Sequence, residues 1–380
     1  MSKPQVLVFI DWYKPFFKAG GPVRSLVNLV DHLHDRVDFH IVTGDTDYMD
    51  DRSPRSLPTG RWTVLDRGEH VWYASTSGRT MASWKKLLTE KHWDVVYING
   101  LYSRWSTVMP LWLLRGSDQR RIVAVRGMLA AGPMRQSSLK KRIFLVVMKA
   151  LGCFKDVEFQ ATNAEEVQDI ERWFGRGTKI HHAPNLARKP DGRGPSPIAK
   201  ERGALRLVSA ARIAEEKNTL FAIERLKEVK GTVQFDLYGT VYDQAYWDRC
   251  QQAIATLPAN INVQWHGQLE NDRVMPVLAG SHALFMPSVG ENFGHALLEA
   301  LTVGRPLLTS DRTPWKDLER QQAGWDLSLE SPEHFVAAIQ GLVNTDQPTY
   351  NAWSAGAYAL GMRYLNDPAP VERSFRLFRP

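Results

Sequence analysis

Short apolar runs alternate with longer segments of helical period along almost the whole chain. The runs are continuous rather than alternating, as expected of strands that are covered on both faces. A repeated strand and helix is typical of βαβ units and predicts parallel sheets. The predicted strands are 6–10, 39–43, 95–98, 122–125 and 157–162 in the first half, and 205–211, 233–239, 261–267, 282–288 and 305–310 in the second.

The alternation is interrupted at LARKPDGRGPSPIAKERGA, which is rich in Pro, Gly and charge and has no apolar period. Such a composition predicts a linker. We therefore expect an α/β protein with two doubly wound, Rossmann-like parallel-sheet domains in tandem, 1–187 and 203–359, that face a cleft. A C-terminal helix at about 360–380 is expected to pack back on the first domain.

Length and composition agree with this division. A chain of 380 residues fits two hydrophobic cores better than one. The formal charge of +7 favours anionic partners, among them nucleic acid, an acidic membrane surface and phosphorylated small molecules. The two cysteines, Cys153 and Cys250, match no metal-ligand or redox spacing, which favours buried thiols in a reducing compartment.

Two further features concern location in the cell. The N-terminal residues MSKPQVLVFID resemble a first β-strand rather than a signal peptide. The longest apolar stretch begins at Ile143, is broken by Lys149, and is shorter than the roughly 20 residues of a membrane-spanning helix. We expect a cytoplasmic protein, either free or peripheral on the inner face of the cell membrane.

The stretch GENFGHALLEA carries two glutamates, Glu291 and Glu299, directly after the predicted strand 282–288. The turn at Gly290 predicts a helix that continues to Val303. The first turn of a helix presents unpaired amides and the positive end of the helix dipole, which suit a diphosphate. Because this helix is apolar nearly all round, a pocket is favoured over solvent as the place of Glu299.

A second group of polar residues lies in ARIAEEKN, just after the predicted strand 205–211. Arg212 offers a planar fork to phosphate oxygens and Lys217 offers a compact point charge. A solvated turn, in which Glu215 and Glu216 pair with these cations, is the open alternative.

A double glycine, Gly20 and Gly21, precedes a predicted helix in KAGGPVRSLVNLV. Glycine allows a backbone to approach a ligand closely, and Pro22 suits the first helical position. The segment lacks the three spaced glycines of the dinucleotide-binding fingerprint, so a simple turn stays an open alternative.

No metal site is predicted from the sequence. Asp45 and Asp47 form a D-x-D pattern of the kind that chelates a cation, but acidic loops after strands are common. Four histidines, two of them adjacent, also lack the additional ligands at the spacing that a zinc site needs: His32, His34, His181 and His182.

Several of these segments resemble one enzyme family. FMPSVGENFGHALLEALTVGRPLLTSD, with its Glu-x7-Glu spacing, resembles the donor-site motif of retaining glycosyltransferases of the GT-B fold, most closely glycosyltransferase family 4. AARIAEEKN is similar to the Arg-x4-Lys element of that family, and KAGGPVRSLVNL resembles its N-terminal glycine loop. YINGLYSRWS, VRGMLAAGPMRQSSLKKRIFL and ATNAEEVQDI resemble bacterial members that build capsule, O-antigen or exopolysaccharide. The resemblance runs from about residue 5 to residue 330.

The resemblance implies roles for particular residues. Arg212 and Lys217 would bind the donor diphosphate, Glu299 the ribose hydroxyls, and Glu291 the hydroxyls of the transferred sugar. Arg212, Lys217 and Glu291 would form the catalytic set. The other donor-binding residues would be Gly20, Gly21, Asn292, Phe293, Gly294, His295 and Leu297.

The sequence departs from the family in three places. Asn218 stands where glycine is common, which is tolerable for a helix cap. Asn99 and Arg126 stand where many members carry histidine, so no histidine is carried over as catalytic. These two residues are candidates for contact with the acceptor or with phosphate.

The implied activity is retaining transfer of a hexose-type sugar from a UDP- or GDP-sugar to a hydroxyl of a glycan, expected to be lipid-linked, in polysaccharide or lipopolysaccharide biosynthesis. Neither a cofactor nor a metal is expected, and the acceptor would attack on the face that the phosphate leaves. The basic segment 136–155 is a candidate for contact with an anionic membrane, although a core-facing helix with a basic edge also fits it. The alternatives are a sugar-nucleotide epimerase, a phosphorylase, or an inactive basic scaffold that binds membrane or nucleic acid; nucleic acid is not an expected partner of the transferase.

Overall fold

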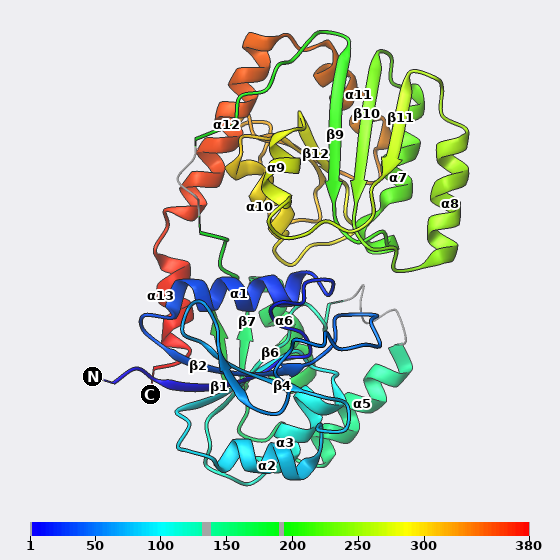
Figure 1. The fold of residues 1–380 in the computed structure, drawn as a ribbon. Coiled ribbons are helices and arrows are strands. Elements are labelled where there is room, and N and C mark those ends of the chain that lie inside the picture. The colour runs from blue at the N-terminus through cyan, green and yellow to red at the C-terminus, as the bar shows by residue number, and fades with distance from the viewer. Residues whose placement is uncertain (1, 131–137, 190–193, 380) are drawn as a thin grey trace. The chain divides into compact units, whose positions relative to one another are not determined.

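The chain folds into two compact units in the computed structural model, which describes residues 2–130, 138–189 and 194–379. Unit 1 comprises Met1–Lys189 and Pro368–Pro380, and unit 2 comprises Pro190–Asp367. Each unit is an α/β sheet covered by helices on both faces, so the expected pair of Rossmann-like domains is confirmed (Figure 1).

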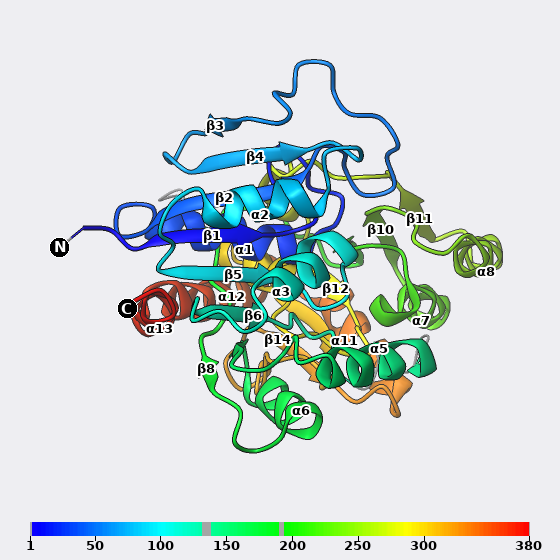
Figure 2. The same cartoon turned by 90° about the horizontal axis from the view of Figure 1, so that it is seen from below.

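Unit 1 is built on an eight-stranded sheet in the order β3-β4-β2-β1-β5-β6-β7-β8, and only β3 runs antiparallel to its neighbour. Figure 2 shows β3 and β4 at one edge and β8 at the other. The strands are β1 (Gln5–Phe9), β2 (Asp38–Gly44), β3 (Trp62–Val64), β4 (His70–Ala74), β5 (Val95–Asn99), β6 (Arg121–Ala124), β7 (Glu158–Ala161) and β8 (Ile180–His182).

Both faces of this sheet are apolar. Successive residues of a strand point to opposite sides, so a continuous apolar run places hydrophobic side chains on each face. In β1, Leu7 and Phe9 belong to one buried cluster, while Val6 and Val8 belong to another. The described helices are α1 (Gly21–Leu33), α2 (Met81–Thr89), the π-helical turn η1 (Arg104–Val108), α3 (Met109–Leu113), α5 (Ser138–Ala150), α6 (Ala164–Phe174) and α13 (Ala369–Arg376).

Unit 2 has a six-stranded parallel sheet in the order β11-β10-β9-β12-β13-β14. Its strands are β9 (Ala204–Ala210), β10 (Thr232–Tyr238), β11 (Ile261–Trp265), β12 (Ala283–Met286), β13 (Leu307–Ser310) and β14 (Gly324–Leu327). Its helices are the 3-10 turns η2 (Glu215–Lys217) and η3 (Leu226–Glu228), α7 (Thr219–Arg225), α8 (Gln244–Ala255), α9 (Val274–Ala279), α10 (His295–Thr302), α11 (Pro332–Asn344) and α12 (Gln347–Leu365). Side chains of α7, α8 and α11 form the main apolar cluster with the sheet, while α10 packs against α12.

The segment expected to be a linker packs in part on unit 2. Lys200 donates its amide to the Gln347 side chain at 2.7 Å, and Arg305 donates to the carbonyl of Ser196 at 2.7 Å. The boundary between the units falls between Lys189 and Pro190, inside the expected linker at 187–203. Residues 190–193 of the predicted linker lie outside the described residues.

The chain returns to unit 1 at Pro368, later than the expected start at about 360, because α12 belongs to unit 2. The return is held by packing: the Phe378 ring lies 5.6 Å from that of Phe39 and 5.5 Å from that of Tyr97, measured between centroids. Arg36 also donates to the Glu372 carboxylate at 2.5 Å. In the described parts of the chain, no helix is long and apolar enough to cross a membrane.

We predict that Phe378→Ala destabilises unit 1 by about 3–5 kcal/mol, since it removes a fully buried aromatic side chain and leaves a cavity. The measurement is the urea dependence of amide hydrogen exchange in β2 and β5. Arg373→Ala, at an exposed position of α13, the helix that ends two residues before Phe378, is the control and is expected to change little. Equal exchange in the two variants would show that the residues after α13 are not part of the core of unit 1.

Candidate functional site

The candidate site of unit 2 lies where the strand order reverses. From β9 the chain adds β10 and β11 on one side and then crosses to add β12, β13 and β14 on the other. The loops that follow β9 and β12 therefore diverge at the carboxyl ends of neighbouring strands. In open α/β sheets this divergence creates the crevice in which ligands bind.

An ion pair connects these two loops. Lys217, in the loop after β9, donates to Oε1 of Glu291, in the loop after β12. The same oxygen accepts the hydroxyl of Ser288 at 3.0 Å. The Lys217 and Glu291 side chains are only 17% and 10% exposed, so the pair is largely shielded from water. The structure thus brings together two residues that the sequence places 74 positions apart.

Arg212 lies in the same loop as Lys217 but is engaged differently. Its guanidinium donates to Glu216 at 2.9 Å and lies over the Tyr242 ring, 5.0 Å from the centroid. Glu215 pairs with Arg249 instead, at 2.6 Å. The expected alternative, pairing of the loop glutamates with nearby cations, is therefore found for Arg212. Because both side chains of the Arg212–Glu216 pair are more than a third exposed, the pair is weak and exchangeable with a stronger anion.

The helix that carries Glu299 starts later than the sequence predicts. It begins at His295 rather than near Gly290, and it ends at Thr302. Gly294 precedes it with φ of 74°, a left-handed conformation that glycine adopts without strain. Glu291 consequently lies in the loop before the helix, while Glu299 lies on its second turn and is 6% exposed. The burial of Glu299 agrees with the apolar surroundings expected for it.

The remaining predicted donor-side residues form the entrance to α10. Phe293 is buried, with its ring 4.7 Å from that of His295 and its carbonyl accepting Nε1–H of Trp315 at 3.2 Å. Leu297 is fully buried under this turn, and Asn292 is half-buried. Phe293 and Leu297 therefore hold the shape of the loop with their side chains, so any ligand contact they make is through the backbone.

One further glycine shapes the site and was not singled out from the sequence. Gly239 follows β10 with φ of 143°, and a Cβ there would lie 1.9 Å from the carbonyl oxygen of Ala211. Only glycine allows this approach of the loop after β10 to the residue before Arg212. Its signal in the sequence is a glycine directly after an apolar strand.

Asn218 is the first residue after the cationic loop and has φ of 59°. It makes no side-chain cap for α7, so the expected capping role is not what the structure shows. Its suitability comes instead from the tolerance of asparagine for the left-handed region, which explains how it can replace a glycine.

The glycines expected to contact the donor from the first domain lie at the start of α1. Gly20 precedes the helix with φ of 73°, Gly21 is its first residue, and a Cβ at either would meet no atom within 4 Å. This open space leaves room for a ligand beside the backbone.

Arg126 and Asn99 contact each other in unit 1. The Arg126 guanidinium donates to Oδ1 of Asn99 at 2.6 Å, to the Tyr97 hydroxyl at 2.7 Å, and to the Asn185 side chain. Much of its donor capacity is thus used within the protein. These contacts favour a role for Arg126 in holding the strand-end loops together. The expected contact of Asn99 and Arg126 with the acceptor or with phosphate stays a prediction.

Asp11 is a candidate that sequence reasoning missed. It follows β1, and its Oδ1 accepts the hydroxyls of Ser103 at 2.5 Å and Ser106 at 2.8 Å, from the segment after β5. The strand order of unit 1 reverses between β1 and β5, so this network occupies its ligand-binding edge. Burial raises the pKa of Asp11, although the two hydroxyls and Arg79 oppose this. Its place directly after a buried strand is the signal that could have identified it.

The D-x-D pattern is used inside the fold. Asp47 accepts the amides of Phe17 and Lys18, each at 3.1 Å, and Asp45 lies 3.4 Å from Arg79. Of the predicted non-ligand histidines, His32 contacts the carbonyl of Ala187 at 3.0 Å and His181 contacts Glu158 at 2.6 Å. His34 lies 3.2 Å from Asp35, and His182 is the last residue of β8.

Comparison with known proteins supports this picture. Residues 196–360, most of unit 2, match the family model described as glycosyl transferases group 1. No curated protein sequence matches the chain significantly.

Solved structures resemble the whole chain in fold. Sucrose-phosphate synthase from Thermosynechococcus elongatus aligns with a TM-score of 0.73 at 14% identity, covering 100% of this chain and 98% of that one. Anabaena HepE in complex with UDP-glucose aligns with a TM-score of 0.68 at 14% identity, covering 98% of both chains. WaaG, described as a glycosyltransferase involved in lipopolysaccharide biosynthesis, aligns with a TM-score of 0.66 at 15% identity, covering 97% of this chain and 98% of that one. The neighbours are GT-B glycosyltransferases, so the two-domain fold expected from the resemblance is the one observed.

We predict that Gly294→Ala destabilises unit 2 by about 1–3 kcal/mol, because alanine is strained in the left-handed region and its Cβ would lie 2.6 Å from Cδ1 of Leu297. Gly290→Ala is the matched control, since a Cβ there meets no atom within 4 Å. The measurement is the urea dependence of amide exchange in α10 and β12. If both variants lose the same stability, the left-handed start of α10 is not what Gly294 provides.

Proposed function

We propose that the protein is a retaining glycosyltransferase that moves a hexose-type sugar from a UDP- or GDP-sugar to a hydroxyl of a glycan acceptor. The observation that carries the proposal is the Lys217–Glu291 pair at the crevice between β9 and β12, inside the region that matches glycosyl transferases group 1. A cation and a carboxylate side by side suit a ligand that has a diphosphate next to a hydroxyl-bearing sugar.

The donor diphosphate is assigned to Lys217, Arg212 and the start of α10. A lysine ammonium has three N–H bonds, so Lys217 can keep Glu291 and still donate to phosphate. Arg212 can exchange the exposed carboxylate of Glu216 for a phosphate oxygen. The helix end adds amides and a positive dipole, so the negative charge is matched by the protein itself without a metal.

The sugar-binding roles are assigned to the two glutamates. Glu299, buried on the second turn of α10, would accept hydrogen bonds from the ribose hydroxyls. Glu291, fixed by Lys217 and Ser288, would accept hydroxyls of the transferred sugar. A carboxylate already held by two donors keeps its orientation when the sugar arrives, which is what positioning for transfer requires.

The proposed transfer step uses these positions. The acceptor oxygen forms the new bond to C1 of the sugar while the bond from C1 to the diphosphate oxygen breaks on the same face. The acceptor proton passes to the leaving phosphate oxygen, and the charge that develops there is stabilised by Arg212, Lys217 and the helix end. No carboxylate is assigned as a covalent nucleophile in this mechanism. The acceptor is proposed to be a glycan of polysaccharide or lipopolysaccharide biosynthesis, linked to lipid.

We predict that a UDP- or GDP-sugar raises the melting temperature of the full chain, by an amount equivalent to about 2.7 kcal/mol at 100 times the dissociation constant. Lys217→Met and Glu299→Gln should remove most of this effect, because they remove a phosphate donor and a ribose acceptor. Glu291→Gln should lower the transfer rate more than it lowers donor binding. Lys227→Met and Glu228→Gln, both exposed on η3 at the far end of α7, are the matched controls.

The product distinguishes the transferase from its alternatives. Proton NMR of the sugar released or transferred should show the donor's anomeric configuration, whereas inversion would contradict the retaining mechanism. A changed sugar still attached to the nucleotide would indicate an epimerase. Absence of any donor-induced shift, together with salt-sensitive binding to vesicles or RNA, would indicate a scaffold.

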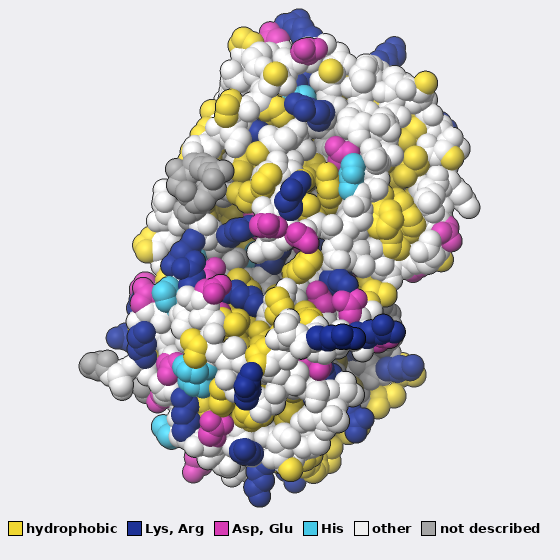
Figure 3. Space-filling model, viewed as in Figure 1, with side chains coloured by type: hydrophobic (Ala, Val, Ile, Leu, Met, Phe, Trp, Pro, Cys, Tyr) yellow, Lys and Arg dark blue, Asp and Glu magenta, His cyan; other side chains and the backbone are white. Residues whose placement is uncertain are grey.

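We also propose that unit 1 contacts an anionic membrane through α5, where a lipid-linked acceptor would be presented. This helix buries Leu145 and Met148 and partly buries Phe144. Five other apolar side chains of α5 and the turn after it are 41–69% exposed: Leu139, Ile143, Val146, Val147 and Leu151. Their spacing of three and four residues makes one continuous stripe. Lys140, Arg142, Lys149 and Lys155 lie beside it and are exposed. Figure 3 shows hydrophobic and basic side chains adjacent at the lower right, where Figure 1 places α5.

We predict that Val146→Asp weakens binding to vesicles containing phosphatidylserine by about tenfold or more, because burial of one such side chain contributes about 1.5–3 kcal/mol. The measurement is co-sedimentation with vesicles of defined composition. Met49→Asp, at a position that is 68% exposed in a loop of the same unit, is the control. Equal binding of wild type and both variants would contradict the contact. The start of the expected basic segment, residues 136 and 137, lies outside the described residues.

A further inference from the structure

Three potential metal ligands meet at the first residues of two neighbouring strands in unit 1. Asp38 and His40 lie two positions apart at the start of β2, so their side chains share one face of the sheet. His70 is the first residue of β4, and the parallel register pairs it with His40. One ligand atom of each residue lies within 4.8 Å of those of the other two.

The two imidazoles present unsatisfied nitrogens. Nδ1 of His40 and Nδ1 of His70 are buried, and neither has a hydrogen-bond partner. Each lies 3.7 Å from Oδ1 of Asp38, beyond hydrogen-bond distance. His40 as a whole is only 6% exposed. Buried polar atoms are nearly always paired, so two such nitrogens around one carboxylate require an explanation.

We propose that Asp38, His40 and His70 bind a divalent transition metal of the zinc class. Imidazole nitrogen and carboxylate oxygen are ligands that zinc prefers, at about 2.0–2.2 Å, which places tetrahedral ligands roughly 3.3–3.6 Å from one another. The 3.7 Å separations between Asp38 and each imidazole are close to this spacing. Two neutral imidazoles and one carboxylate leave a fourth position for water.

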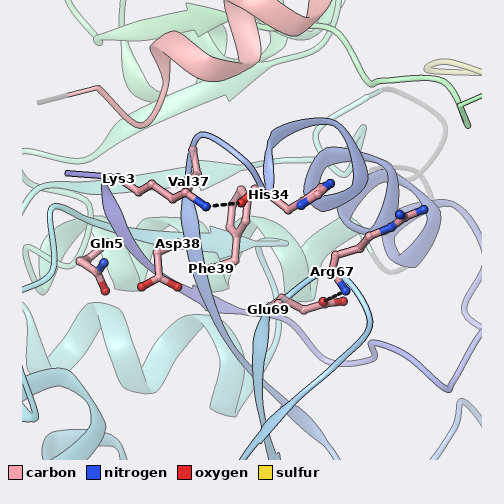
Figure 4. A pocket seen from close by; sticks show the side chains of 9 residues that line it. Lys3, Gln5, His34, Val37, Asp38, Phe39, Arg67 and Glu69 are labelled. Atoms are coloured by element: carbon pink, nitrogen blue, oxygen red, sulfur yellow. Dashed lines mark hydrogen bonds between the residues drawn. The ribbon is translucent and has the colours of Figure 1, made fainter. Parts of the chain in front are cut away.

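A cavity lies beside Asp38, although neither His40 nor His70 lines it. Asp38 lines it together with Gln5, Lys3, Glu69 and five other residues, and Figure 4 shows its carboxylate beside the Gln5 side chain. The Asp38 side chain is 29% exposed, so an ion can reach the carboxylate without unfolding of the strands.

Binding requires one change in the imidazole pair. The rings are stacked, with centroids 4.4 Å apart and planes inclined by 3°. A metal lies close to the plane of each imidazole that binds it, so parallel rings must tilt apart. His40 is held between the rings of Trp62 at 5.2 Å and Trp93 at 5.0 Å. The His70 side chain is 35% exposed and has room to turn, so it is the ring that moves.

Lys91 determines the proton positions on His40. Its ammonium lies 3.0 Å from Nε2 of His40 and also donates to Gln5 at 2.5 Å. Coordination through Nδ1 places the proton on Nε2, so Lys91 must give up that contact and keep Gln5. Lys91 therefore competes with the metal.

The proposed site is separate from the transfer chemistry. It lies at the amino ends of β2 and β4, whereas Asp11 and Ser103 lie at the opposite, carboxyl edge of the same sheet. A metal here would join β2 to β4 and so stabilise the edge of unit 1 that carries β3. If no metal binds here, the proposed donor site and the experiments that test it are unaffected.

The test is a zinc titration of the full chain after chelator treatment, with a chromophoric chelator as competitor. We expect one zinc ion per chain with micromolar or tighter affinity, and a Co²⁺ complex with absorption typical of four-coordinate geometry. Asp38→Asn and His70→Gln should each weaken zinc binding by at least about 10- to 100-fold, the loss typical of an outer-shell partner, because each removes a ligand. Lys91→Met should strengthen it, because it removes the competing ammonium. Mg²⁺ should not compete, since it prefers oxygen ligands.

His92→Gln is the matched control, because this histidine is 87% exposed and lies 3.9 Å from another carboxylate, that of Asp94. It should bind zinc as wild type does. No zinc binding by wild type, equal binding by wild type and His70→Gln, or weaker binding by Lys91→Met would each overturn the proposal. Far-UV circular dichroism of each variant separates loss of a ligand from loss of fold.

Discussion

The ion pair between Lys217 and Glu291 joins the two loops on which the candidate site of unit 2 depends. Both side chains are largely buried, so removal of either one leaves the other charge without compensation in a poorly solvated place. Because the loops follow neighbouring strands on either side of the strand-order reversal, the pair also fixes the width of the crevice between them. Arg212, Ser288 and the start of α10 are positioned around this bond.

The two units present different chemistry at their carboxyl edges. Unit 2 offers two cations and a helix start, which suit phosphate. Unit 1 offers a buried carboxylate, Asp11, held by two serine hydroxyls, and an arginine that is largely engaged by neutral side chains. Carboxylates and hydroxyls suit neutral, hydroxyl-rich ligands, so this difference agrees with the proposal of a donor on unit 2 and a glycan on unit 1.

Sequence reasoning succeeded where one strand or one loop contains the whole signal. The strands at the centre of each sheet were predicted because burial on both faces makes them continuous apolar runs. Four strands at or near the sheet edges were missed: β3, β4, β8 and β14. β3 and β8 have only three residues each and are not fully buried, and the four residues of β14 include Gly and Asp. The start of α10 was placed too early because the polar residues of GENFGH fit a first helical turn as well as a loop. The left-handed conformation of Gly294 sets the start of the helix at His295, and the sequence alone does not reveal that conformation.

Features that depend on strand register could not be predicted in this way. His40 and His70 are 30 positions apart in the sequence, and only the pairing of β2 with β4 makes them neighbours. Ligands are expected at the carboxyl edge of a parallel sheet, so the amino edge is where buried polar side chains are least expected. His40 is buried between Trp62 and Trp93, and two buried imidazole nitrogens without hydrogen-bond partners are costly for stability alone. A metal ion would offset that cost by satisfying both orphan nitrogens at once, which is why the cluster is better explained by a ligand than by packing.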